Sequence, residues 1–213
     1  MLHNGIFNKK IKTMKSLLTI LLLFPFLFVF GQKENHANCE TAQEVFDKKT
    51  IVVEKMSEDG LAKEKIDELK CFKNGLQPDY IVNNVYWFTW ECIKKGNLGF
   101  EISPLEEADD IDFVVFSSTY DTNLCNGKKV LRCMAAGYYE ISSPCMGVTG
   151  LKVGELDKSK DSGCKDDETN FLRELNMQVG ETYFLCVINV SSKSGFSIKF
   201  NGDGLIGNEN PKK

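Results

Sequence analysis

Short stretches in which apolar and polar residues alternate run along the chain from about residue 79 to residue 202. Phe196, Ile198 and Phe200 share one side of an extended chain, and Ser197 and Lys199 lie on the other. Stretches of this kind are rich in β-branched and aromatic residues and are separated by Gly, Asn, Asp, Ser and Pro. They predict strands at 85–92, 98–105, 112–119, 130–134, 182–190 and 195–200. Because no long helical period lies between them, the sequence predicts an all-β fold, an antiparallel two-sheet β-sandwich.

The segment before these strands is ambiguous. Residues 61–72 (LAKEKIDELKCF) are good helix formers with spaced apolar positions, which favours a short N-terminal helix. A strand that begins near Ile66 is the alternative. Residues 157–170 are polar and carry one cysteine, which predicts a long exposed loop tied down by Cys164.

The first 31 residues have the pattern of a secretory signal peptide. Four lysines precede an apolar stretch at 17–30, and Val29 and Gly31 are small enough for cleavage after Gly31, whether translation begins at Met1 or Met14. The apolar stretch is shorter than the roughly 20 residues that a membrane-spanning helix needs, so we expect no stable membrane insertion after cleavage. The predicted organisation is a signal peptide at 1–31, one sandwich domain at 32–202 and a flexible tail at 203–213.

Charge argues against a polyanionic partner. The first 31 residues hold four of the 26 basic residues and none of the 30 acidic ones, so the remainder carries 22 basic against 30 acidic residues. A net charge near −8 does not favour nucleic acid or an anionic membrane surface.

All eight cysteines follow the predicted cleavage point, which in an oxidising compartment predicts up to four disulfides. The spacing favours Cys125 with Cys133, which would close a hairpin, and Cys145 with Cys164. Cys39 with Cys71 and Cys92 with Cys186 then remain. Eight cysteines allow 105 connectivities, so these pairs are hypotheses. The absence of any Cys-x-x-Cys pair argues against a zinc site.

Three stretches carry a family resemblance: NNVYWFTWECIKKGNLGFEISP at 83–104, DDIDFVVF at 109–116 and GETYFLCVINVSSKSGFSIKFNG at 180–202. They resemble a β-sandwich domain of secreted and cell-surface proteins of Bacteroidetes-type bacteria, and the stretches LRCMAAG (131–137), PCMGVTGL (144–151) and SGC (162–164) fit the same pattern. The chain is more distantly similar to pre-peptidase C-terminal and CUB-like jelly rolls, which are accessory modules. The resemblance implies a jelly-roll-like fold and an exported protein, and it supplies no ligand.

Histidine is nearly absent. The two histidines are His3, within the signal peptide, and His36, close to the new N-terminus. Serine and cysteine triads, histidine-ligated zinc and the usual general base are therefore not expected, and the protein is predicted not to be an enzyme. A glycosidase-type pair of carboxylates is the one catalytic alternative.

The densest polar cluster is acidic. Five carboxylates fall within seven residues, and a sixth lies beyond the following strand: Glu106, Glu107, Asp109, Asp110, Asp112 and Asp121. Charges this close repel one another unless they are solvated or bridged by a cation. The sequence leaves two interpretations open, a solvated loop and a calcium site with oxygen ligands.

Aromatic residues are the other candidates for ligand contact. Trp87 and Trp90 face opposite ways on one predicted strand, and an exposed indole could stack on a sugar, although core packing of both is the alternative. Tyr120, Tyr138 and Tyr139 lie in predicted loops, where ligand contacts on sandwiches gather.

We therefore expect a non-catalytic binding or adhesion module, exported to the periplasm, the cell surface or the medium, with a protein or glycan of the cell envelope as its partner. A structural subunit of an envelope or secretion-associated assembly is the first alternative, and a carboxylate-based glycoside-active enzyme is the second.

Overall fold

The structure is a computed structural model that describes residues 35–57, 69, 71–72, 84–118, 125–135, 147–161 and 169–207. The chain divides into two compact units, Met1–Lys33 and Glu34–Lys213, and all described residues belong to the second. The predicted signal peptide lies outside the described residues and stays a prediction. No helix among the described residues is long and apolar enough to span a membrane.

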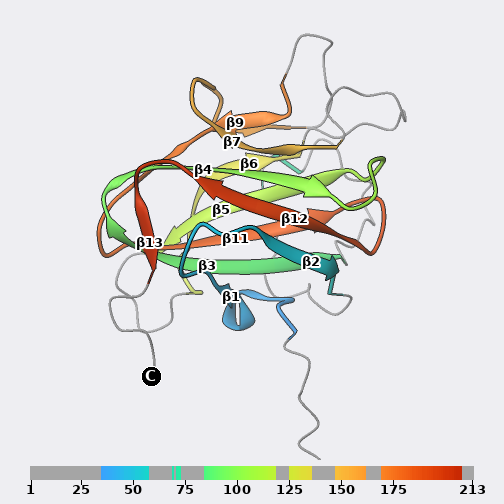
Figure 1. The fold of residues 1–213 in the computed structure, drawn as a ribbon, viewed down its shortest axis with the longest axis horizontal. Coiled ribbons are helices and arrows are strands. Elements are labelled where there is room, and N and C mark those ends of the chain that lie inside the picture. The colour runs from blue at the N-terminus through green and yellow to red at the C-terminus, as the bar shows by residue number, and fades with distance from the viewer. Residues whose placement is uncertain are drawn as a thin grey trace, which may run out of the picture. The chain divides into compact units, whose positions relative to one another are not determined.

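The described part is built from two sheets (Figure 1). One sheet has seven strands, with β13 pairing beside β1 along the outer edge of β3. Its path is β1-β3-β11-β5-β6-β8. The strands are β1 (Gln43–Glu44), β3 (Val85–Lys94), β11 (Thr182–Asn189), β5 (Ile111–Ser118), β6 (Lys129–Met134), β8 (Ser159–Lys160) and β13 (Leu205–Gly207).

The second sheet has six strands in the described residues, with the path β2-β12-β4-β7-β9 and β10 paired to β4. The strands are β2 (Ile51–Lys55), β12 (Ser194–Asn201), β4 (Gly96–Pro104), β7 (Thr149–Lys152), β9 (Phe171–Arg173) and β10 (Leu175–Met177), and a 3-10 turn, η1 (Cys39–Thr41), precedes β1.

The predicted two-sheet β-sandwich is confirmed, with one correction to its wording. The long strands pair antiparallel, but β1 with β3, β6 with β8 and β7 with β9 pair parallel, so both sheets are mixed. The strands β1, β7, β8 and β9 of these pairs are two to four residues long and lie at or near sheet edges, where a short stretch can return from a long connection. The sequence pattern predicted only the long alternating strands and therefore only antiparallel pairing.

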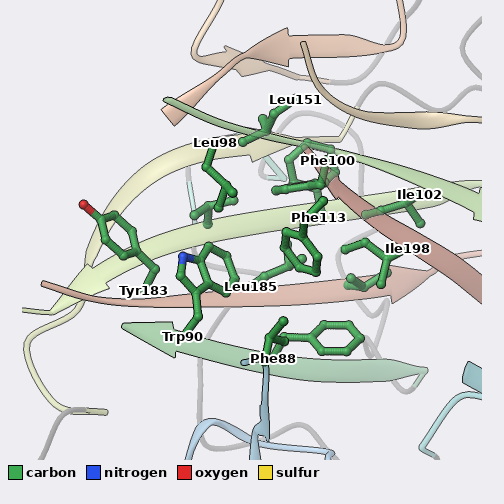
Figure 2. Packing of buried hydrophobic residues seen from close by; sticks show 14 of the residues in the cluster. Phe88, Trp90, Leu98, Phe100, Ile102, Phe113, Leu151, Tyr183, Leu185 and Ile198 are labelled. Carbon is green, nitrogen blue, oxygen red and sulfur yellow. The ribbon is translucent and has the colours of Figure 1, made fainter. Parts of the chain in front are cut away.

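Apolar side chains from both sheets meet in one core. Phe100 of β4 and Phe113 of β5 contact edge to face, with ring centroids 5.2 Å apart, and Trp90 of β3 stacks on Tyr183 of β11 at 5.9 Å (Figure 2). Such aromatic pairs add to the free energy gained by removing the rings from water. This core fixes which face of each central strand points inward.

The other face of the seven-stranded sheet is also buried over part of its length. Trp87, Val114 and Cys186 point away from the core, yet each is 1 % exposed or less. Residues of the segment 37–42 and the pair 71–72 pack on this face. The central strands of this sheet therefore carry apolar residues at successive positions, because both of their faces are buried over part of their length.

Two disulfides among the described residues attach that covering layer to β6 and to the turn that precedes it. Cys39 is joined to Cys125, with Cα atoms 5.8 Å apart, and Cys71 is joined to Cys133, with Cα atoms 6.2 Å apart. The predicted pairs Cys125–Cys133 and Cys39–Cys71 are therefore wrong. Residues 129–134 form an extended strand, so Cys133 lies about 13 Å along β6 from its first residue, on the side away from Cys125.

The predicted pair Cys92–Cys186 is also wrong. Cys186 lies opposite Trp87 in the β3–β11 ladder, five residues from Cys92. Cys92 points into the core between the sheets, whereas Cys186 points to the outer face. Cys92 is a buried thiol whose pKa is raised by burial. The pair Cys145–Cys164 lies outside the described residues. Of the predicted helix at 61–72 only residues 69 and 71–72 are described, and they form a bend and a turn.

The predicted flexible tail starts too early. Residues 205–207 form β13 on the edge of β3, and Ile206 is buried in the core. The turn into β13 needs Gly202, which has a φ of +106° and would place a Cβ 2.2 Å from the carbonyl oxygen of Asn97. Residues 208–213 lie outside the described residues.

Candidate functional site

The outer face of the seven-stranded sheet changes character along its strands. On β3 the outward side chains run Val85, Trp87, Thr89 and Glu91, and the apolar half is buried while Thr89 and Glu91 are partly exposed. On β11 the outward side chains Ile188, Cys186 and Phe184 are apolar and buried, and the change to a polar, partly exposed residue comes at Thr182. The covering layer therefore lies over one half of the face, and the polar half is open.

That open half is a groove with a volume of about 540 Å³. Its floor comes from four outward side chains of β3 and β11: Thr89, Glu91, Thr182 and Phe184. Its walls come from η1, residues 44–46, the Cys39–Cys125 disulfide and Gly207 of β13. We call this hollow the outer-face groove.

Among the described residues, the groove is lined by acidic side chains and by no basic one. Glu40, Glu44 and Glu91 contribute carboxylates, and none of the described lining residues is Lys, Arg or His. Phe46 adds an aromatic ring that is 53 % exposed. Thr89 is fixed because its hydroxyl donates to the carbonyl oxygen of Tyr183 at 3.1 Å.

The groove was not predicted from the sequence, because the candidate sites were chosen for tryptophans and for dense acidic charge. The signal that could have revealed it is the change from apolar to polar residues at alternate positions of 85–91 and 182–188. The walls could not have been found, because they depend on the Cys39–Cys125 pairing.

The acidic loop that precedes β5 lies elsewhere, beside the end of β11. Asp109 is buried, and its Oδ2 accepts hydrogen bonds from Asn189 Nδ2 and Ser192 Oγ, both at 2.7 Å. The Asn189 side-chain oxygen in turn accepts from the backbone N–H groups of Ser191 and Ser192. This network ties the loop before β5 to the turn between β11 and β12.

The side chains of Asp112, which is buried, and of Asp110, which is partly buried, have no such partners. Asp112 is 5 % exposed, and its Oδ1, like Oδ1 of Asp110, has no hydrogen-bond partner. Burial, reinforced by the neighbouring Asp109, raises the pKa of Asp110 from 3.8 to about 6. Burial, reinforced by Asp110, raises the pKa of Asp112 well above its ordinary value.

The rest of the predicted calcium ligands do not join this pair. Glu106 and Glu107 are exposed, and Asp121 lies outside the described residues. In the described part of the chain, no three His, Cys, Asp or Glu side chains are grouped so as to hold a metal ion. Calcium binding by the loop stays a prediction.

The two tryptophans are both packed in the protein. Trp87 is 1 % exposed and stacks on Phe116 with ring centroids 5.8 Å apart, below the ammonium group of Lys128. Trp90 is 3 % exposed and stacks on Tyr183. Neither presents an indole face to a sugar. Tyr120, Tyr138 and Tyr139 lie outside the described residues.

Comparison with known proteins finds no matching family model, curated protein or solved structure.

Proposed function

We propose that the chain is an exported, disulfide-bonded binding module that does no chemistry of its own, and that the outer-face groove is its ligand site. The observation that carries the proposal is the groove itself. The covering layer on the sheet stops where the outward side chains turn polar, and a hollow remains above them.

The make-up of the groove supports binding over catalysis. In the part of the lining that the structure describes, the polar side chains are three carboxylates and two threonines, and none is a histidine or lysine that could act as a neutral-pH base or nucleophile. The floor is held by two central strands of one sheet, which gives a ligand a preformed surface.

The placing of the disulfides supports export. The Cys39–Cys125 bond forms part of the groove wall, so the groove is complete only where disulfides persist. The predicted signal peptide also favours export to an oxidising environment, which includes the periplasm, the cell surface and the medium.

The test is a ligand screen of the oxidised protein against envelope glycans and peptides, repeated with a variant that fills the groove. Thr182→Phe places a ring on the groove floor, and Ser197→Phe places the same ring on β12 of the other sheet as a matched control. A ligand lost with Thr182→Phe and kept with Ser197→Phe supports the proposal. Ligands that both variants bind equally well would move the site elsewhere, and a stable assembly partner with no groove dependence would favour the structural-subunit alternative.

A further inference from the structure

We propose that the outer-face groove takes a basic segment of a partner protein, bound in extended form through its arginine or lysine side chains. This inference rests on the proposed function, because it names the class of ligand for the same groove.

The charge of the groove selects the sign of the ligand. Among the described residues, Glu40, Glu44 and Glu91 have no hydrogen-bond or ion-pair partner, and none of the described residues that line the hollow is basic. A ligand that carries positive charge would supply the missing partners, whereas an anionic ligand would meet three like charges.

The spacing of the carboxylates selects an extended ligand over a single ion. Glu44 pairs in register with Thr89, and Glu91 lies two residues further along β3, about 7 Å away along the strand. These side chains are not grouped so as to hold a metal ion. Alternate side chains of an extended peptide are also about 7 Å apart, so two basic residues separated by one residue match two of the carboxylates.

The aromatic ring at the rim favours arginine among the basic residues. Phe46 is 53 % exposed at the groove wall. A planar guanidinium group can stack flat on such a ring while its N–H groups donate two parallel hydrogen bonds to a carboxylate, whereas an ammonium group acts as a point charge without that planar geometry.

The experiment measures the affinity of an acetylated, amidated hexapeptide of alternating arginine and glycine for the oxidised protein. Glu40→Gln/Glu44→Gln/Glu91→Gln removes the groove carboxylates, and Glu54→Gln/Glu101→Gln/Glu107→Gln removes the same charge from exposed sites outside it. We expect the groove variant to bind about tenfold more weakly, or worse, and the control variant to bind within about twofold of the wild type. Urea unfolding of each variant checks that the fold is kept.

Several results would overturn the inference. Equal losses of peptide affinity in the two triple variants would show that the peptide is attracted by the overall negative charge of the protein and not by the groove. Spermidine that binds as tightly as the peptide would show that a free polyamine suffices. A neutral glycan that binds the wild type but not the Thr182→Phe variant would support the groove as a ligand site and refute the inference that its ligand is a basic segment. If no ligand of any class depends on Thr182→Phe, the proposed function fails together with the inference.

Discussion

The stability of this sandwich should fall as the pH rises from 5 to 8, and the cause is the neighbouring pair of the partly buried Asp110 and the buried Asp112. Both carboxyl groups have a pKa raised by burial, so between the unfolded and folded pKa values the folded state binds more protons than the unfolded state. The contribution of the pair is thus most favourable below the unfolded pKa and is lost as the pH rises through the folded one.

The size of the loss follows from the shift at Asp110. A rise of the pKa from 3.8 to about 6 lowers the unfolding free energy at high pH by about 3 kcal/mol relative to low pH. Asp112 lowers it in the same direction. Asp110→Asn removes that charge. The variant should therefore be more stable than the wild type by up to about 3 kcal/mol at pH 8 and should differ little from it at pH 4.

The assay is urea unfolding of the oxidised protein in chelator from pH 4 to pH 8, followed by the fluorescence of the buried Trp87 and Trp90. Glu106→Gln, which removes an exposed charge from the same loop, is the control and should follow the wild type. A wild-type stability that stays constant or rises from pH 5 to pH 8 would refute the reasoning. Repeating the series with calcium tests the calcium prediction, because an ion held by the two aspartates would remove the fall at high pH.

Other predictions concern packing and covalent structure. Replacing Cys39 and Cys125 by serine should lower the unfolding free energy by up to about 4 to 5 kcal/mol, since the bond closes a loop between residues 86 positions apart. Arg132→Met should cost about 1 to 3 kcal/mol in urea unfolding, because the guanidinium donates to the carbonyl of Arg173 in β9 and to that of Glu174 before β10, and so joins the two sheets. Phe113→Ala should cost about 3 to 5 kcal/mol by the same assay, since the ring is fully buried in the core. Gly202→Ala should cost about 1 to 2 kcal/mol or more through its positive φ and the Asn97 contact, and an unchanged denaturation midpoint would contradict this.

The long strands could be predicted because each keeps one apolar face over six or more residues. Predicted strands at 85–92, 112–119 and 182–190 became Val85–Lys94, Ile111–Ser118 and Thr182–Asn189. The short edge strands carry no such signal: β1 has two residues, and its pairing with β3 depends on where the chain returns. The tail was misjudged for a similar reason, since one buried residue, Ile206, fixes β13.

The candidate sites were harder to predict because they depend on contacts between distant residues. Sequence alone marked Asp109, Asp110 and Asp112 as one acidic cluster. In the structure Asp109 is held by the turn after β11, whereas the Oδ1 atoms of Asp110 and Asp112 are buried without a hydrogen-bond partner. The disulfides were mispaired because spacing along the chain says little about which cysteines meet on the outer face of a sheet.

The central claim is that the outer-face groove is the ligand site, and an NMR titration of the oxidised protein with the arginine–glycine hexapeptide tests it most directly. The account predicts that backbone amide shifts change at Glu40, Glu44, Thr89, Glu91 and Thr182, which come from four separate elements around one hollow. Shift changes that cluster on the outer face of the six-stranded sheet, or that spread over all acidic surfaces alike, would contradict it.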